Sequence, residues 1–193
     1  MNPQGTPKRA DVRSSGVNVR RGCLALVLLA VAPVFRGEAA GPPGDSCPPH
    51  LFVLGRSKNA NIVVYDANRN SAGDFAVSDP VVAYWLLNGE TGAREELNQV
   101  ERQRAYGFDV TPGRTPGTLE MAFKARRSRR LVVRMLNGCP VATGPIGGHD
   151  GILRRMFVQS TEGSILPRVE YVELFGEDLT TGGPVYEKFV PAK

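Results

Sequence analysis

Short apolar runs separated by turn residues fill the chain from residue 50 onward, and this pattern constrains the fold more than any other feature. The runs are rich in β-branched and aromatic residues and are too short for helices, so each predicts a strand. Neither strand–helix alternation nor an internal repeat appears. The pattern therefore predicts an all-β fold, either an antiparallel β-barrel or a two-sheet sandwich of about eight strands with one short helix. The runs occupy residues 51–55, 62–67, 81–87, 108–110, 118–124, 131–136, 152–160, 168–175 and 185–190.

The predicted helix covers Glu95–Tyr106, where the strand pattern breaks. Its first residues are acidic, Arg102 and Arg104 lie near its end, and Gly107 follows. Acidic residues at the start and basic residues at the end of a helix complement the helix dipole, and a glycine commonly ends a helix. We expect this helix to lie over the domain.

Segments rich in Gly, Pro, Asn and Asp predict the connections between strands. Asn68–Asp79 is expected to be a surface loop, and Asn88-Gly89 is a strong signal for a tight turn. Asn137–Gly151 is rich in glycine and proline and is interpreted as a further loop.

The first 40 residues have the composition of a secretory signal peptide. A basic segment precedes the apolar run Cys23–Phe35, which is shorter than the roughly 20 residues needed to cross a bilayer. Arg20-Arg21 stands close before this run, so export by the twin-arginine route is an alternative to the general secretory route. We expect a signal peptide at 1–40, a flexible lead-in at 41–49 and one β-rich domain at 50–193, located in the periplasm or outside the cell.

The basic character of the whole chain comes mostly from this leader. Six of the 24 Lys and Arg residues and two of the 19 Asp and Glu residues lie in 1–40, so 18 cations and 17 anions remain, a net charge of +1. A nearly neutral exported domain is not expected to bind nucleic acid.

Cysteine usage agrees with export. Beyond the leader only Cys47 and Cys139 remain, an even pair that predicts a disulfide in an oxidising compartment.

The first two predicted strands carry a dense polar motif, which reads Arg56-Ser57-Lys58-Asn59-x-Asn61-Ile62-Val63-x-Tyr65-Asp66-x-Asn68. One interpretation is structural: an Arg56–Asp66 ion pair and asparagine-rich turns fix the hairpin register. The other is functional: Arg56, Lys58 and Asn61 line a pocket for an anionic or carbonyl-bearing ligand. A one-residue change of register moves a side chain to the other face of a sheet, so the sequence leaves both interpretations open.

Three further blocks follow this motif in order: Tyr84-Trp85, Arg94-Glu95-Glu96-Leu97 and Ala105-Tyr106-Gly107. Together the four blocks resemble a bacterial family known as domain of unknown function 4833, and the resemblance covers nearly all of residues 50–190. It implies no particular activity, but it implies that the blocks form one site or one structural signature. The expected ligand-binding residues are Arg56, Lys58, Asn59, Asn61, Tyr65, Asp66, Asn68, Trp85, Arg94 and Tyr106.

Trp85, the only tryptophan, is expected to pack in the core, with a stacking platform for a sugar or another ring as the alternative. Signals for catalysis are weak, because neither a Gly-x-Ser-x-Gly nor a His-Glu-x-x-His motif occurs. Glu95, Glu101 and His149 are the candidates for an acid or base if the protein is an enzyme. The spacing of Cys47, His50, Cys139 and His149 matches no zinc-finger pattern, and no cofactor or metal is predicted.

A basic segment joins two of the predicted strands and is interpreted as a solvated hairpin tip, or alternatively as a contact for an anionic membrane surface. It contains Lys124, Arg126, Arg127, Arg129 and Arg130. Taken together, the sequence favours an exported module that binds a small ligand or an envelope component. The alternatives are a hydrolase acting on an envelope polymer and a structural protein without a pocket.

Overall fold

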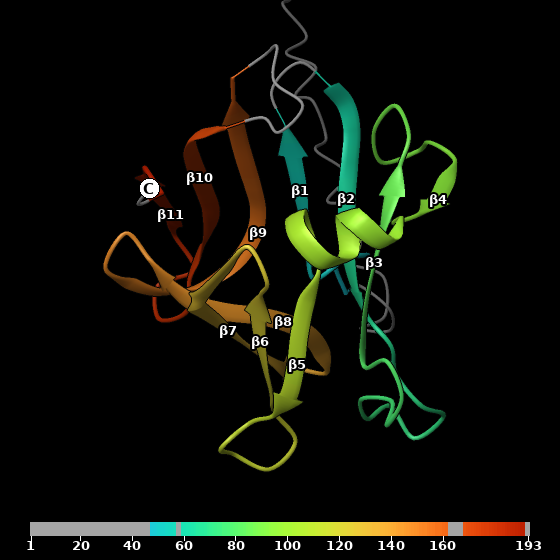
Figure 1. Ribbon diagram of the computed structural model, residues 1–193. Helices are drawn as coiled ribbons and strands as arrows, with labels where there is room; N and C mark the ends of the chain where they lie inside the picture. The colour runs from blue at the N-terminus through green and yellow to red at the C-terminus, as the bar shows by residue number, and fades with distance from the viewer. Residues whose placement is uncertain (1–46, 57–58, 162–167, 192–193) are drawn as a thin grey trace, which may run out of the picture. The chain divides into compact units, whose positions relative to one another are not determined.

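The structure, a computed structural model, describes residues 47–56, 59–161 and 168–191 (Figure 1). These residues form one sheet of 11 strands that curls into a half-barrel, with very little helix. The all-β prediction is confirmed, although the strands outnumber those expected. The predicted signal peptide lies outside the described residues. Within the part of the chain that is described, no helix is long and apolar enough to cross a membrane.

The strands follow the predicted apolar runs closely, with two additional elements. Their bounds are β1 (Phe52–Arg56), β2 (Asn59–Ala67), β3 (Val81–Leu86), β4 (Arg94–Glu96), β5 (Phe108–Pro112), β6 (Leu119–Phe123), β7 (Arg126–Leu136), β8 (Cys139–Ile146), β9 (His149–Ser160), β10 (Val169–Asp178) and β11 (Pro184–Phe189). The additional strands are β4 and β8.

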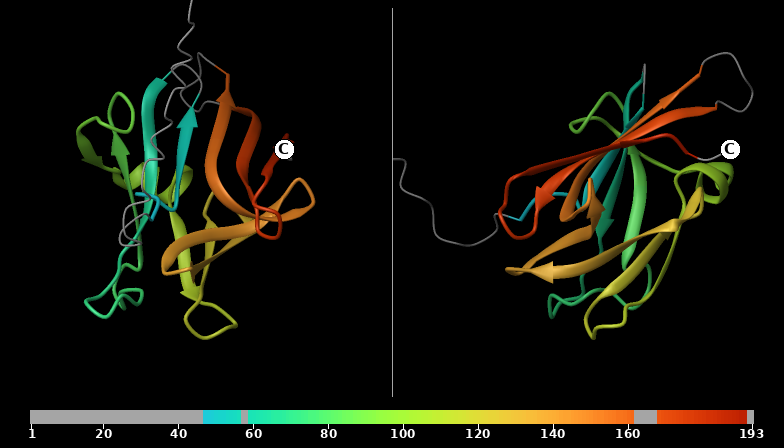
Figure 2. Two further views of the ribbon diagram at one scale, coloured as in Figure 1. Left: turned by 180° about the vertical axis from the view of Figure 1, so that it is seen from behind. Right: turned by 90° about the vertical axis from the view of Figure 1, so that its left-hand side faces the viewer.

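Strand β9 is the junction of the sheet. The order is β4-β3-β2-β1-β9-β8-β7-β6-β5, and β10 pairs with both β9 and β11. The early residues of β9 pair with β8, its later residues pair with β1, and β10 accompanies it from end to end. The β1–β9 pair is parallel, whereas every other pair in the sheet is antiparallel. Figure 2 shows β9 and β10 running side by side past β1.

The prediction of a loop at Asn137–Gly151 is wrong, because this segment contains β8 and the start of β9. Its prolines occupy positions where β8 has a partner on one side only. Pro140 lies in the half that pairs with β7, and Pro145 lies in the half that pairs with β9. A proline removes a backbone donor, and a strand tolerates this loss where no neighbour needs that donor.

The predicted helix over Glu95–Tyr106 is largely wrong as well. Its first residues belong to β4, which pairs with the Tyr84–Leu86 segment of β3. Helical structure begins at residue 99 and continues as the short π-helix η1 (Glu101–Ala105), which lies across one face of β1, β2 and β3 (Figure 1). Gly107 follows the helix as expected, and a Cβ atom there would stand 1.5 Å from the Arg102 carbonyl oxygen. The close approach of this carbonyl therefore requires glycine.

Only part of the basic segment is a hairpin tip: Lys124 lies in the turn between β6 and β7, whereas the four arginines lie on strand β7. Most of its cations have acidic partners: Lys124 and Arg127 lie 3.9 and 3.6 Å from Asp109, and Arg130 lies 2.8 Å from Glu120. Arg129 forms two hydrogen bonds with Glu187, and Arg126 lies over the Phe189 ring. Three carboxylates thus compensate part of the positive charge of these five cations. Binding to an anionic membrane surface stays an untested prediction.

The two faces of the β1–β3 region carry different apolar clusters. Side chains alternate along a strand, so Val63, Tyr65 and Trp85 point to the main core. Val64 and Tyr84 point to the other face, where they form a second cluster with Leu86. We call these the core face and the back face. The predicted core role of Trp85 is confirmed, since its exposed fraction is 8%.

A disulfide joins Cys47 to Cys139, as the sequence predicted. It links the segment before β1 to the first residue of β8 across a sequence separation of 92 residues. In the chain-entropy model, a crosslink closing a loop of this length stabilises the folded state by about 4–5 kcal/mol. The bond also fixes the segment that carries His50.

Candidate functional site

The structure divides the ten expected ligand-binding residues between the two faces of the sheet. On the core face, Arg56, Asn61 and Trp85 line one pocket. On the back face, Asp66, Asn68 and Arg94 line another. Tyr65 and Tyr106 lie behind the first pocket and support it. Lys58 lies outside the described residues, and of Asn59 only the backbone is described.

The pocket on the core face, which we call the Arg56 pocket, has a volume of about 250 Å³. Its walls come from the end of the β1–β2 hairpin where the two strands are joined, from β3 and β4, and from the segment that leads into η1. It is lined by Arg56, Asn61, Trp85, Leu87, Glu95, Glu96, Asn98 and Glu101.

Arg56 is held in place by two aromatic rings. Its Nη1 donates a hydrogen bond to the Tyr106 hydroxyl at 2.7 Å. Its guanidinium carbon lies 5.4 Å from the centre of the Trp85 ring and 5.9 Å from that of Tyr106, within the range of a cation–π interaction. Burial raises the pKa of Tyr106, while the nearby Arg56 cation opposes this rise.

Tyr65 supports this arrangement from below. Its buried hydroxyl donates to the backbone carbonyl of Tyr106 at 2.9 Å and so connects β2 to the end of η1. The Tyr65 ring stacks on Phe52 with a centroid distance of 4.4 Å. Burial raises the pKa of Tyr65 strongly, so its hydroxyl keeps its proton and remains a donor. Tyr65 therefore positions the pocket and is not available to a ligand.

Glu101 anchors the start of the helical segment. Its backbone N–H donates to Asn98 Oδ1 at 3.0 Å, and the Asn98 backbone N–H donates to Glu101 Oε2 at 2.9 Å. This reciprocal pair is a capping box, which satisfies two backbone donors at a helix start. The indole N–H of Trp85 donates to the same Oε2 at 3.2 Å. Glu101 is thus engaged in holding the helix against β3.

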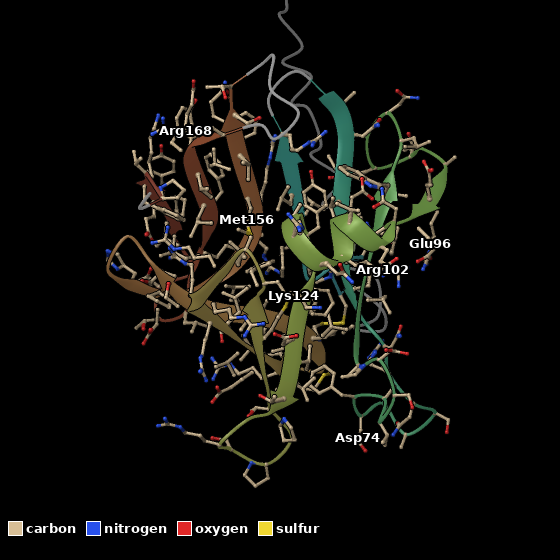
Figure 3. All side chains as sticks on the ribbon, in the orientation of Figure 1. Asp74, Glu96, Arg102, Lys124, Met156 and Arg168 are labelled. Atoms are coloured by element: carbon tan, nitrogen blue, oxygen red, sulfur yellow. A yellow bond between two sulfur atoms is a disulfide. The ribbon has the colours of Figure 1, made fainter. Side chains whose placement is uncertain are left out.

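The charges around the Arg56 pocket are mixed. Glu96 is paired with two cations, since its carboxylate oxygens lie 3.1 Å from Arg94 and 2.8 Å from Arg102. Figure 3 shows Glu96 at the edge of the sheet and Arg102 on the helical segment. Glu95 has no hydrogen bond or ion pair with any residue that the structure describes. The pocket therefore offers Arg56 as a donor group and Glu95 as an acceptor.

The pocket on the back face, which we call the His50 pocket, has a volume of about 300 Å³. It lies between the disulfide-linked segment, the end of β2 and the neighbouring strands β3 and β4. It is lined by Cys47, Pro48, Pro49, His50, Leu51, Asp66, Ala67, Asn68, Arg69, Val82, Arg94 and Pro140.

Asp66 stands at the centre of the polar groups of this pocket. Its Oδ1 lies 2.7 Å from His50 Nδ1, and its Oδ2 accepts a hydrogen bond from the Tyr84 hydroxyl at 2.6 Å. Burial, and then the bond to Asp66, raise the pKa of Tyr84 to about 12. The guanidinium of Arg94 lies over the Tyr84 ring at 3.8 Å. Arg56 and Asp66 have separate partners on opposite faces, so the Arg56–Asp66 ion pair is not formed.

Among the polar residues that line these pockets, Arg69 and Asn98 were missed in the sequence analysis, and His50 was not recognised as a pocket residue. His50 appeared there only as a zinc-type ligand. The signal that could have indicated it is its place directly after the rigid Cys47-Pro48-Pro49 segment. The pairing Phe52↔Tyr65 then brings His50 beside the end of β2.

His149 lies in neither pocket. Its Nδ1 is 3.1 Å from Asp178 Oδ2, and its side chain is 62% exposed. Among the residues that the structure describes, no three His, Cys, Asp or Glu side chains are grouped closely enough to hold a metal ion.

These features define the class of protein: a disulfide-linked β half-barrel with a polar pocket on each face of its β1–β4 half. The chain belongs to the family described as domain of unknown function DUF4833, whose model matches residues 52–188. No curated protein and no solved structure matches it. The family resemblance inferred from the four sequence blocks is confirmed.

Proposed function

We propose that this domain is a small-ligand-binding module and that the Arg56 pocket takes an uncharged ligand bearing hydroxyl and carbonyl groups. The observation that carries the proposal is the placement of Arg56, which Tyr106 and Trp85 hold at the pocket wall. A guanidinium has five N–H donors, and its bond to Tyr106 uses one of them. An arginine fixed in this way is preorganised to receive a carbonyl or hydroxyl oxygen.

The charge of the lining favours an uncharged ligand. Among the described residues that line the pocket, Arg56 is the one cation, whereas Glu95, Glu96 and Glu101 each carry a carboxylate. Arg94 and Arg102 compensate Glu96, but the other two carboxylates would repel an anion. A sugar that carries an amide suits the mixture, because it can accept from Arg56 and donate to Glu95. The predicted export makes an envelope component of this chemistry the natural candidate.

The single tryptophan provides the readout. Trp85 is one of the residues that line the pocket, so occupancy should change its fluorescence. We would titrate the protein with N-acetylglucosamine and with its β-1,4-linked dimer, and compare the parent with Arg56→Gln and Glu95→Gln. Glu90→Gln is the matched control, because Glu90 is exposed in the same β3–β4 connection and does not line the pocket.

We expect a saturable fluorescence change in the parent and in Glu90→Gln. Binding should weaken at least tenfold in the two pocket variants, since a hydrogen bond to a charged group contributes about 1.5–3 kcal/mol and about 1.4 kcal/mol corresponds to a factor of ten. The proposal is contradicted if neither sugar gives a saturable change, or if Glu95→Gln binds as tightly as Glu90→Gln. Thermal unfolding of each variant shows whether Arg56→Gln still folds.

A further inference from the structure

The His50 pocket contains an acid–base group that the proposed function does not use. Asp66 accepts a hydrogen bond from Tyr84 at Oδ2, so Oδ1 is the oxygen that faces His50. An ionised carboxylate only accepts hydrogen bonds, and therefore His50 Nδ1 must carry the proton of that 2.7 Å contact. In the neutral imidazole this leaves Nε2 as the free acceptor. Nε2 has no partner among the described residues.

The surroundings of His50 are held firmly. The Cys47–Cys139 disulfide and Pro48-Pro49 fix the segment in front of it. Leu51, the next residue, is 1% exposed and donates its backbone N–H to the Tyr65 carbonyl at 2.9 Å. The side chains of His50 and Asp66 are 19% and 23% exposed. The pair is therefore sheltered but still open to the pocket.

Besides His50, three charged residues among those described line the pocket, namely Asp66, Arg69 and Arg94. Their formal charges sum to +1, which favours an anion. Asp66 carries the charge nearest to His50, and the Tyr84 hydroxyl is the second donor to Asp66. Arg69 and Arg94 both line the pocket. Glu96 compensates Arg94 in part, whereas Arg69 is exposed and has no acidic partner in the described part of the chain.

We propose that the His50 pocket binds a small oxyanion, the phosphate or carboxylate group of a ligand, and that His50 takes up one proton when the anion binds. The two arginines oppose a third positive charge in the empty pocket. A bound anion removes this opposition, so Nε2 accepts a proton from solvent and donates the new N–H to an oxygen of the anion. The imidazolium keeps its Nδ1–H on Asp66. This site lies on the opposite face of the sheet from the Arg56 pocket, and its ligand binding is tested separately.

The two histidines of the chain make the test direct, because His149 is an internal control. We would follow the imidazole Cε1–H resonances of both histidines by NMR as the pH is varied, with inorganic phosphate, with acetate, and with chloride at matched ionic strength. We expect phosphate or acetate to shift the His50 resonance saturably. The titration midpoint of His50 should rise by about half a pH unit or more, because an anion that binds the protonated form more tightly must raise its pKa.

Two variants complete the experiment. Arg69→Gln removes an exposed pocket cation and should weaken anion binding at least fivefold, whereas Arg114→Gln, an exposed arginine outside the pocket, should bind like the parent. His50→Gln should abolish the pH dependence of binding, measured by calorimetry. A response to phosphate alone assigns a phosphate-type ligand, and an equal response to acetate assigns a carboxylate. The proposal is overturned if the His50 midpoint is the same with and without both anions, or if His50 and His149 shift equally.

Discussion

Tyr84 and Trp85 are consecutive residues of β3, yet they bind carboxylates on opposite faces of the sheet. The Tyr84 hydroxyl donates a hydrogen bond to Asp66 at 2.6 Å on the back face. The Trp85 indole N–H donates a hydrogen bond to Glu101 at 3.2 Å on the core face. The alternation of side chains along a strand therefore divides one short sequence block between two networks. Arg56 belongs to the network of Trp85, and Asp66 belongs to that of Tyr84.

This separation predicts that Arg56→Ala and Asp66→Ala destabilise the fold independently. Each should lower the free energy of unfolding by about 1–3 kcal/mol, because each removes a partner from a tyrosine hydroxyl that is largely buried. The loss of unfolding free energy in the double variant should equal the sum of the losses in the two single variants within about 0.5 kcal/mol. Urea unfolding followed by Trp85 fluorescence measures all three.

A double-mutant cycle of Tyr84→Phe and Asp66→Ala is the matched comparison, because the side chains of Tyr84 and Asp66 are in direct contact. In this cycle the double variant should lose less unfolding free energy than the two single variants lose together, by about 0.5 kcal/mol or more. If instead the Arg56–Asp66 cycle shows the larger coupling, the assignment of these residues to separate networks is wrong.

The sequence was sufficient for the fold class because burial of alternating apolar residues sets the strands. It was less informative at β8, where glycine and proline suggested a loop. Two signals in that region could have corrected this. Asn137-Gly138 and Gly147-Gly148 each join strands by two residues with positive φ, from 51° to 86°, as hairpin turns require. The prolines are tolerated because β8 changes its partner at Thr143, a feature that local sequence does not encode.

The candidate site was harder to predict than the fold. The motif residues were named, but their division between two pockets depends on register, and the β1–β2 register shifts between Gly55 and Arg56. The contact of Arg56 with Tyr106 spans 50 residues and depends on where η1 lies on the sheet. His50 was missed because its partner Asp66 comes from the far end of β2, 16 residues away. These are tertiary relationships, and no periodicity in the sequence records them.

The buried hydroxyl of Tyr65 should contribute measurably to stability. Tyr65→Phe removes the donor to the Tyr106 carbonyl while preserving the ring that stacks on Phe52. We expect the free energy of unfolding to fall by about 1–2 kcal/mol, because the carbonyl loses its partner in a buried place. Tyr186→Phe is the control, since the Tyr186 hydroxyl bonds Glu173 at the surface and its loss should cost less than about 0.5 kcal/mol. Equal losses in the two variants would argue against a structural role for the Tyr65 hydroxyl.

The capping box should stabilise the start of the helical segment. Asn98→Ala removes the acceptor of the Glu101 backbone N–H and should lower the free energy of unfolding by about 1 kcal/mol. Gln99→Ala, at the exposed neighbouring position, should be nearly neutral. Because Glu101 also accepts from Trp85, Asn98→Ala should change the fluorescence spectrum of the folded protein as the helix start loosens. An Asn98→Ala protein as stable as Gln99→Ala would show that the capping pair carries no net stability.

The disulfide prediction can be tested by reduction. Reduced protein and the double variant Cys47→Ser/Cys139→Ser should both be less stable than the oxidised parent by about 4–5 kcal/mol, since the crosslink closes a long loop of the unfolded chain. Chemical denaturation with and without reductant measures this difference. The variant should not respond to reductant, and reactive thiols at Cys47 or Cys139 in the untreated folded parent would contradict the bond.

The pairing of Arg129 with Glu187 should make stability depend on pH. The hydrogen bonds from Arg129, together with that from the Gly147 backbone N–H, lower the pKa of the Glu187 carboxyl. A carboxyl whose pKa is lower in the folded protein stabilises the fold above its unfolded pKa, and this contribution is lost as the pH falls through the folded pKa. Glu187→Gln should therefore be less stable than the parent at pH 7 by about 1–3 kcal/mol, and the difference should narrow as the pH falls below the ordinary glutamate pKa of about 4.3. Glu170→Gln, at an exposed site, should follow the parent throughout. Urea unfolding from pH 7 to pH 3 measures these differences, and a gap that stays constant over this range would assign the loss to packing instead of charge.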